Sequence, residues 1–599
     1  MAYLILTPHA ELLPKENEGV ILIDEWCLTA DFLKEMSNRG TVYNVNFSRL
    51  NCRSQYAEES VKIESYYEQM LVNVAQSLNS FHAVKKDLRY WRLLLGPALY
   101  TLVAHLYDRW SALLSVDKSA YKYIPHFECA GYRFTPQKLL DVDPDSDDYN
   151  HYLLANAAKY MQLNVEFLKK EREEVNSELE TRENSSSVQI KSSAPFASKL
   201  LQRAGKLWNA HRSRQSSKVF ITKSYLPPHI EFLLSISLGA TCAAHTISWD
   251  SSKTINEDAR NSIRSGGRSS NFFEEYLCAM VSKLIPKAYI EDYEILQKSW
   301  IERNWPNCPE VIFTSTAFQF DEVFQHYAAT MQETGTSLVV GQHGGVTGIS
   351  KWSWGATHQL EISDKFLSWG KKSFRKNVEP SFVLTNLGRH VRYNSKSNEL
   401  LLVTVPMRRY PHKSNAWPVG FSQAKDFLNS QIQFNKTLKQ EISRSLKLRI
   451  PVKTDRHYKS GFVNAWTSNF TNIKIDPSIT SFWAELKKAR LLVYTYNSTG
   501  YLQSLSMNFP TIIFWDTENF ETNENFERAL FTLEKVGIFF RKGVDAANHI
   551  NIIWPNVLNW WQSYEVQVAV NQFCNEFART PKAMDFFRLR KLISPHIIY

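Results

Sequence analysis

The sequence predicts a parallel α/β protein made of two Rossmann-like domains that face each other across a cleft. Apolar runs of strand length alternate with helical segments, and no hairpin signal joins neighbouring runs, which is typical of parallel sheets. The alternation occurs once before and once after a polar stretch near Tyr393. The 599 residues, 44% of them hydrophobic, also exceed what a single core normally holds.

The first domain is expected to span residues 1–393. It begins with the buried strand VILIDEWC (Val20–Cys27) and continues with the apolar helical stretch Leu88–Trp110. Pro97 lies inside that stretch and predicts a kink or a pair of helices. The strand VIFTSTAF and the segment SLVVGQHGGVTG (Ser337–Gly348), a strand that runs into a Gly-rich turn, follow later.

The second domain is expected to span residues 394–555. Its strands are ELLLVTVP, LKLRIPV, LLVYTYNST and PTIIFW, and helical segments separate them. Ligands bind such folds at the carboxyl ends of strands, and in a two-domain protein also between the halves. The site residues are therefore sought where strands end.

A helical, basic insert is predicted around residues 169–218. Within it, residues 199–218 combine an apolar helical face with five flanking cations, and the chain as a whole carries a net charge of +10. This pattern favours peripheral contact with an anionic membrane; the alternative is an ordinary surface helix packed on its own domain. No nucleic-acid-binding motif is present, so the positive charge is assigned to a membrane surface or to acidic substrates.

The composition predicts a cytoplasmic protein. The seven Cys form no CxxC pair, which indicates a reducing compartment and excludes a disulfide framework. The N-terminus lacks the basic region of a signal peptide, and the longest uncharged apolar run, Leu93–Leu106, is too short to span a bilayer. No P-loop, HExxH or acidic metal pair stands in a suitable place, so neither a metal nor a cofactor is expected.

The first candidate site is GQHGG, in which a strand delivers Gln342 and His343 to its carboxyl end. Gly344 and Gly345 would let the backbone approach a ligand closely. A histidine there can act as a general base on a hydroxyl or, when charged, bind a phosphate; the alternative is a structural histidine in a tight turn.

Two acids follow this turn. Glu361 or Asp364 could serve as the base or stabilise a developing positive charge at the sugar, or both could be solvated acids at a helix start. His343, Glu361 and Asp364 are therefore the three catalytic candidates.

The candidate nucleotide site lies in the second half. The strand LLVYTYNST ends in Asn497, Ser498 and Thr499, and a following helix would offer free N–H groups to a phosphate. Arg449 lies in an otherwise apolar strand and could pair with a diphosphate or a sugar carboxylate. Arg408, Arg409 and His412, after ELLLVTVP, are alternatives for the same role.

The motifs IDEWC, RYWRLLLGP with YDRW, GQHGGVTG, EISDKFLSWG, and NSTGYLQSLSMNFP followed by GIFF occur in this order along the chain. Together they resemble the LIC12162-type transferase family of spirochaete O-antigen clusters, which is often found beside nonulosonic acid genes. More distantly, the layout is similar to GT-B-type capsule Kdo transferases and to CDP-glycerol glycerophosphotransferases. The His-Pro pair common in cytidine-nucleotide enzymes is absent after Arg449, where IPVKTDRH stands.

The resemblance implies a metal-independent glycosyltransferase that moves a CMP-activated ulosonic or nonulosonic acid, such as Kdo or a sialic-like acid, onto a glycan or lipid-linked glycan acceptor. It places His343 on the side of the reacting hydroxyl, and Arg449, Ser498 and Thr499 on the nucleotide side. It also implies that C-terminal helices in residues 556–599 cross back onto the first domain. The alternatives are a polyol-phosphate transferase, a sugar-nucleotide epimerase, or a non-catalytic, membrane-associated assembly protein.

Overall fold

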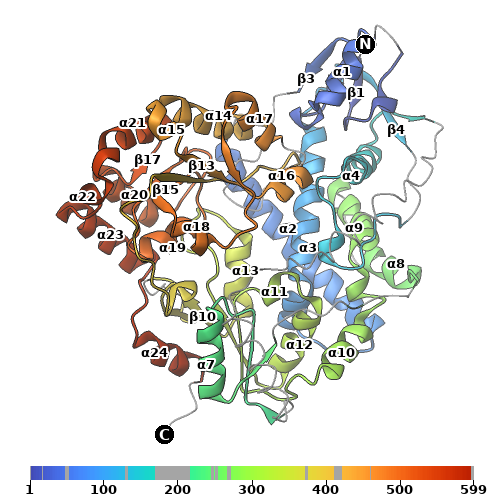
Figure 1. Ribbon diagram of the computed structural model, residues 1–599. Coiled ribbons are helices and arrows are strands. Elements are labelled where there is room, and N and C mark those ends of the chain that lie inside the picture. Colours follow the sequence, from blue (N-terminus) through green and yellow to red (C-terminus); the bar gives the residue numbers. More distant parts are fainter. Residues whose placement is uncertain are drawn as a thin grey trace.

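The computed structural model of the chain contains three parallel sheets, connected by helices (Figure 1). It describes residues 2–15, 18–46, 53–127, 132–168, 216–243, 249, 254–265, 271–370, 375–410, 421–458 and 461–594. The predicted membrane-binding helix at 199–218 falls almost wholly outside these residues, as does His412. No helix in the described part of the chain is long and apolar enough to cross a membrane.

The first sheet lies near the N-terminus and has five strands. Its spatial order is β3 (Tyr43–Val45), β2 (Val20–Leu22), β1 (Ala2–Ile5), β4 (Tyr121–Phe127) and β5 (Val165–Leu168). This sheet is an addition to the two that the sequence predicted, and it lies inside the predicted first domain. Two long helices follow β3: α2 (Arg53–Phe81) and α3 (Leu88–Leu114). Pro97 lies inside α3, which is one helix, so of the two expectations, a kink or a pair of helices, the pair is wrong.

The second sheet has six parallel strands. Their spatial order is β11 (Val378–Pro380), β10 (Lys365–Ser368), β9 (Ser337–Gly341), β8 (Val311–Thr314), β6 (Val219–Thr222) and β7 (Thr241–Ala243). Its helices are α7 (Pro228–Leu238), α8 (Glu257–Ser265), α9 (Phe272–Leu284), α10 (Tyr293–Glu302), α11 (Ala317–Phe320), α12 (Glu322–Glu333) and α13 (Trp354–Ile362). One continuous hydrophobic core joins the first sheet, α2, α3 and one face of this sheet.

The third sheet has the strand order of a Rossmann fold. Its strands are β14 (Lys474–Asp476), β13 (Leu446–Arg449), β12 (Glu399–Val403), β15 (Ala489–Tyr494), β16 (Thr511–Phe514) and β17 (Phe539–Phe540). Its helices are α14 (Phe421–Thr437), α15 (Gln440–Ser443), α16 (Val452–Tyr458), α17 (Phe462–Asn469), α18 (Phe482–Leu486), α19 (Thr499–Ser506), α20 (Glu524–Lys535) and α21 (Gly543–Ile553). Successive strands are added toward one edge of the sheet from β12 to β14 and toward the other edge from β15 to β17. The strand order thus reverses between β12 and β15, and a ligand is expected beside their carboxyl ends.

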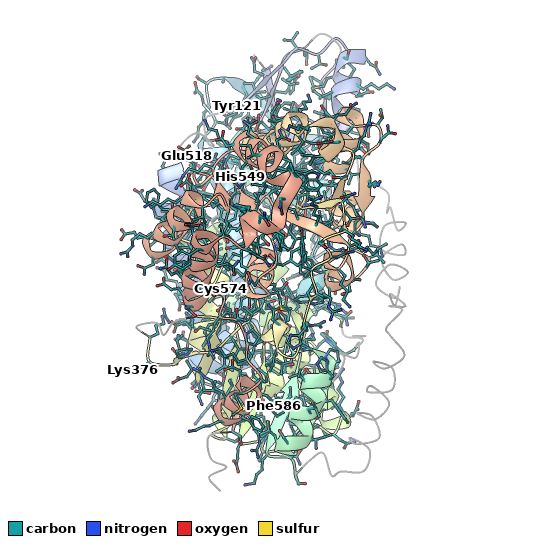
Figure 2. The ribbon with its side chains drawn as sticks, turned by 60° about the vertical axis from the view of Figure 1, so that its left-hand side comes forward. Tyr121, Lys376, Glu518, His549, Cys574 and Phe586 are labelled. Carbon is teal, nitrogen blue, oxygen red and sulfur yellow. The ribbon has the colours of Figure 1, made fainter. Side chains whose placement is uncertain are left out.

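The last helices divide between the second and third sheets. α22 (Val557–Trp561) and α23 (Tyr564–Phe577) pack on the third sheet's core, whereas α24 (Asp585–Ile593) lies against α7 of the second. Figure 2 shows this separation: Cys574 of α23 lies with the third sheet, and Phe586 of α24 lies at the opposite end of the molecule. Leu589 and Ile593 are fully buried there, so the chain's last described helix completes the core of the second sheet.

Candidate functional site

The turn after β9 and the start of α19 are in direct contact. A Cβ atom added to Gly345 would lie 2.3 Å from the Ser498 carbonyl oxygen, and one added to Gly344 would lie 3.7 Å from Thr499 Oγ1. Only glycine allows this approach at position 345. The carboxyl edges of the second and third sheets therefore face each other, which confirms the predicted fold class of two opposed Rossmann-like domains, and they bring together the two motifs that the sequence singled out.

Gln342 shapes the turn that carries His343. Its Oε1 accepts a hydrogen bond from Trp369 N at 2.8 Å, and its Nε2 donates one to the Gly344 carbonyl oxygen at 3.0 Å. The side chain thus joins the end of β10 to the glycine turn and is buried. These two bonds engage both ends of its amide, so its role is to fix the loop rather than to contact a ligand.

His343 lies among the carboxyl ends of β6, β8 and β9. Gln319 Nε2 is 2.8 Å from His343 Nε2, and the rings of Tyr225 and Phe318 lie 6.1 and 6.2 Å from the imidazole, centroid to centroid. Burial lowers the pKa of His343 to about 4, so the ring is neutral at pH 7. It is therefore suited to accept or donate a proton, and it is not a fixed cation for a phosphate.

The tautomer of His343 depends on Gln319. When the amide donates through Nε2, the imidazole carries its proton on Nδ1; when the amide is turned over, Oε1 accepts from Nε2 and Nδ1 has a free lone pair. Nδ1 is buried, and a hydrogen bond between the ring and the backbone of Ser315 raises the pKa against the effect of burial. Gln319 thus fixes the orientation of the imidazole, a role that the sequence did not reveal.

The end of β15 provides the polar tip that the sequence predicted. Ser498 caps α19 by accepting from Gly500 N at 3.4 Å, and Tyr501 donates to Asn497 Oδ1 at 2.9 Å. Asn497 is fully buried, and its Nδ2 has no partner within the described chain. A Cβ at Gly500 would lie 2.5 Å from the Tyr494 ring, so this glycine lets α19 start directly at the strand end.

Arg449 is not available to a nucleotide. At the end of β13 its Nη1 forms a buried ion pair with Asp476 of the neighbouring strand, and its Nη2 donates to the Thr480 carbonyl oxygen at 2.8 Å. The interactions neutralise its charge inside the protein. We therefore correct its role from phosphate binding to holding β13, β14 and the following loop together.

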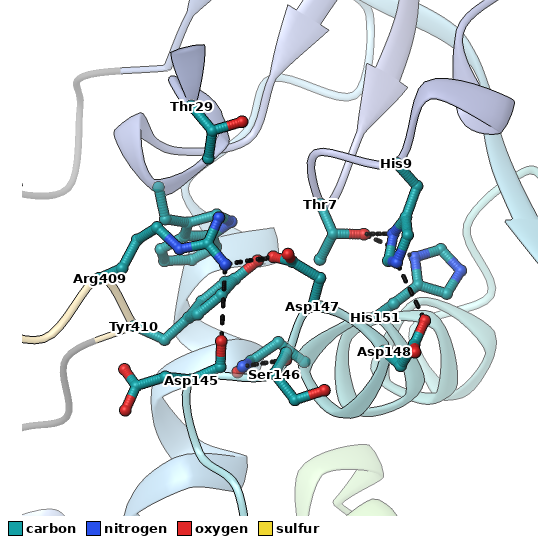
Figure 3. Close-up of polar contacts among 12 residues, drawn as sticks. Thr7, His9, Thr29, Asp145, Ser146, Asp147, Asp148, His151, Arg409 and Tyr410 are labelled. Carbon is teal, nitrogen blue, oxygen red and sulfur yellow. Dashed lines mark hydrogen bonds and ion pairs between the residues drawn. The ribbon is translucent and has the colours of Figure 1, made fainter. Parts of the chain in front are cut away.

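Arg408 and Arg409, the alternatives to Arg449, belong to a contact with the first sheet's domain; Figure 3 shows the part made by Arg409 and Tyr410. Arg409 Nη2 donates to Asp147 Oδ1 at 2.6 Å, the Tyr410 hydroxyl donates to the same oxygen at 2.5 Å, and Arg408 pairs with Asp145 at 2.9 Å. These acids precede and begin α4 (Asp147–Tyr160). The loop after β12 is thereby fastened to the N-terminal part of the chain.

A hydrogen-bonded histidine chain lies beside this contact. Asp148 Oδ1 is 3.0 Å from His9 Nε2, and the Thr7 hydroxyl lies between His9 Nδ1 at 2.8 Å and His151 Nδ1 at 3.0 Å (Figure 3). Among the described residues, no group of three or more His, Cys, Asp or Glu could hold a metal ion. These hydrogen bonds join the segment after β1 to α4 at the first sheet's carboxyl edge.

The two acids predicted beside His343 lie at the opposite edge of the second sheet. Asp364 immediately precedes β10; it accepts from Leu338 N at 2.8 Å and pairs with Arg89 at 2.7 Å. Glu361 is exposed and pairs with Arg375 at 2.6 Å. Because α13 returns the chain to the amino edge, neither acid joins His343 at the carboxyl edge, and we leave both out of the catalytic group.

A cavity of about 420 Å³ follows the carboxyl ends of β15, β16 and β17. Thr495, Trp515 and Arg541, the first or second residues after these strands, line it, and Phe427 of α14 and Lys542 complete its wall. This size lies in the range of small-ligand pockets. The residues were missed because they are separated in the sequence, although PTIIFW was correctly predicted to be a strand.

The fold and the opposed strand edges define a parallel α/β architecture of two facing Rossmann-like domains. The family model described as "LIC12162 family transferase" matches residues 2–591, and the chain belongs to this family. None of the curated proteins matches the chain significantly.

Similar solved structures include three glycosyltransferases. The glycotransferase of kitacinnamycin is 10% identical, with a TM-score of 0.29 over 66% of this chain and 95% of that one. Spinosyn rhamnosyltransferase SpnG, complexed with spinosyn aglycone, is 9% identical, with a TM-score of 0.30 over 62% and 99%. WaaG, involved in lipopolysaccharide biosynthesis, is 10% identical, with a TM-score of 0.27 over 63% and 99%.

Proposed function

We propose that this transferase is a glycosyltransferase that moves a CMP-activated ulosonic or nonulosonic acid onto a surface-polysaccharide acceptor. The observation that carries the proposal is the meeting of two strand ends: the His343 turn after β9 contacts Ser498 and Thr499 at the start of α19. A proton-accepting group and a helix amino terminus then lie on two segments that touch each other. Membership of a transferase family supports the group-transfer part of this reading.

The donor's nucleotide belongs to the third sheet in this proposal. CMP would occupy the cavity along the ends of β15, β16 and β17, with its phosphate toward the N–H groups and hydroxyls that begin α19. Lys542 lines the cavity, as does Arg541, which pairs with Glu527 and Glu534. The acids Asp426, Asp516 and Glu518 also line it, so the phosphate depends chiefly on the amino end of α19. Arg449 takes no part, because its guanidinium is already paired.

His343 acts on the acceptor side. A neutral imidazole can take the proton of the acceptor hydroxyl as its oxygen bonds to the anomeric carbon, while the bond from that carbon to the CMP phosphate breaks. Gln319 positions the ring for this transfer. The leaving phosphate's charge would be met by the amino end of α19 and by the nearby cations, and this proposal needs no metal.

Calorimetric titration of the full chain with CMP, CDP, UDP, GDP and dTDP tests the proposal. We expect CMP to bind most tightly and Thr499→Val to weaken it by about tenfold, the loss of one charge-assisted hydrogen bond. Thr467→Val, on the exposed face of α17, is the matched control and should leave binding unchanged.

Other outcomes discriminate among the rival readings. Preference for CDP would favour a polyol-phosphate transferase, and preference for UDP, GDP or dTDP would discard the ulosonic donor. Binding of none of the five would contradict a nucleotide-dependent enzyme and favour the assembly protein.

A further inference from the structure

A second cavity, of about 290 Å³, lies between the long helices α2 and α3 and the helix α13 that follows the His343 turn. The aromatic side chains of Tyr67 and Trp354 form part of its wall, and their rings meet edge to face at 5.5 Å. The rest of the wall is polar. The cavity is thus large enough for one small ligand unit and joins an aromatic surface to charged groups.

The cavity is acidic. Glu64, Glu68 and Glu361 line it together with a single cation, Arg92. Arg92 is bound by both oxygens of Glu68, at 2.5 and 2.7 Å, and Glu361 pairs with Arg375 outside the cavity wall. Glu64 has neither an ion pair nor a hydrogen bond from its side chain within the part of the chain that the structure describes.

Glu64 is a partly buried carboxylate without a counter-charge. Burial raises its pKa, and the neighbouring Glu68 carboxylate raises it further. Both effects act against the ionised form, and a positively charged ligand would stabilise that form against the repulsion from Glu68. Aromatic rings beside a carboxylate are also favourable surroundings for an ammonium group. The same charges would repel the carboxylate and phosphate of a CMP-activated acid sugar.

His358 supplies the neutral polar group of the cavity. It is 3% exposed, it lines the cavity, and its ring stacks on Trp354 at 4.6 Å. Neither of its ring nitrogens has a hydrogen-bond partner among the described residues. Burial lowers its pKa to about 3, so the ring stays neutral, and Nδ1 is packed toward Gly96 of α3.

The cavity adjoins the proposed catalytic site. Phe318 lies between the two histidines: its ring centroid is 6.2 Å from that of His343 and 6.1 Å from that of His358. Gln359 of α13 also donates to Thr347 Oγ1 at 2.7 Å, which fastens the cavity's helix to the glycine turn. A ligand chain that enters the cleft at His343 would therefore have its next units close to this cavity.

We propose that this cavity is an acceptor subsite that binds an amino sugar with a free ammonium group, Glu64 pairing with the ammonium and the rings of Tyr67 and Trp354 packing against the sugar. The inference rests on the proposed function, because it assigns the second partner of the same transfer. It also fixes the polarity of the cleft: the cationic acceptor unit lies on the α2–α3–α13 side, and the anionic donor lies on the third sheet.

Saturation-transfer NMR of the full chain with glucosamine, N-acetylglucosamine, glucose and ethanolamine tests the inference. We expect glucosamine to bind at least about tenfold more tightly than the other three, since only it carries both the ammonium and the ring hydroxyls. Glu64→Gln should abolish this preference, whereas Glu58→Gln, an exposed position on the same helix, should leave it intact. Equal binding of glucose and glucosamine, or an unchanged preference in Glu64→Gln, would overturn the charged subsite. If ethanolamine bound as tightly as glucosamine, the sugar ring would contribute nothing to binding, and the assignment of a sugar ligand would be overturned.

Titration of the same samples with CMP separates this inference from the proposed function. We expect Glu64→Gln to bind CMP as the unaltered chain does, because the cavity near α13 and the cavity along β15–β17 share no lining residue. CMP binding without glucosamine binding would refute the subsite and leave the transferase proposal standing. Glucosamine binding without any nucleotide binding would support the subsite and refute the proposal of a CMP-activated donor.

Discussion

The end of β9 carries His343 and the end of β13 carries Arg449, two polar residues that the sequence placed at strand ends. They differ in how far their polar atoms are already bonded within the fold. His343 is hydrogen-bonded to Gln319 and to the backbone of Ser315, and it forms no ion pair among the described residues. Arg449 has its guanidinium bound by Asp476 and by the Thr480 carbonyl oxygen. A strand end thus identifies a candidate, but a side chain can serve a ligand only where its polar atoms are not already satisfied within the fold.

The largest effect expected from this comparison is on stability. Arg449→Ala leaves Asp476 buried without its partner, and such a loss costs about 3–5 kcal/mol in the free energy of unfolding. Denaturant unfolding followed by fluorescence measures it. Nucleotide affinity of the folded Arg449→Ala protein should be unchanged; a selective loss of CMP binding with normal stability would return Arg449 to the nucleotide site.

His343→Ala is expected to act on rate and not on folding. Loss of a general base lowers the rate about 100-fold or more, so release of CMP from the donor in the presence of acceptor should fall by at least that factor. The denaturant midpoint should be nearly unchanged, because the ring loses only its hydrogen bonds to Gln319 and Ser315. A loss smaller than tenfold would remove His343 from the chemistry.

The next effect concerns acid stability. Burial holds the pKa of His326 and His358 at about 3 and that of His343 at about 4, below the unfolded value of 6.5. Between these values the unfolded chain binds more protons, so stability should fall as the pH drops from 6.5 toward 4, by about 1.4 kcal/mol per pH unit for each histidine.

Unfolding titrations between pH 7 and 4.5 check this slope, and His343→Gln, which cannot titrate, should make it shallower. Identical slopes in the two proteins would mean that His343 is not buried as a neutral ring. Above pH 6.5 these three histidines are expected to contribute no further change.

The smallest effect is expected at Asp364. Asp364→Asn should change the transfer rate less than twofold, because the residue lies at the amino edge of the second sheet, bonded to Leu338 N and Arg89. Steady-state rates beside those of His343→Ala provide the comparison. A hundredfold loss of rate in Asp364→Asn would contradict the assignment of the chemistry to the carboxyl edge of the second sheet.

The parts of the site that the sequence predicted are those that local pattern determines. A strand that runs into glycines gave the His343 turn, and a strand end with Asn, Ser and Thr gave the start of α19. Their contact follows from the opposed domains. The buried pair of Arg449 was not visible, because Asp476 is 27 residues away and reaches it only through the parallel register of β13 and β14.

Other features depend on where the chain travels between strands. Glu361 and Asp364 are close to His343 in the sequence, but α13 carries them to the far edge. The first sheet was not separated from the second because three of its five strands are no longer than four residues and lie before the long helices. Pro97 stays within one helix, where buried neighbours along most of α3 outweigh the lost backbone bond. The cavity around Glu64 is lined by residues nearly 300 positions apart in the sequence, so no local sequence pattern predicts it.

Hydrogen exchange of the full chain with and without CMP tests most directly whether the two strand ends form one ligand site. The account predicts slower exchange in both the turn at residues 341–348 and the segment at residues 495–506, since one ligand would lie between them. Protection of neither segment, or protection confined to residues outside the facing strand ends, would contradict it.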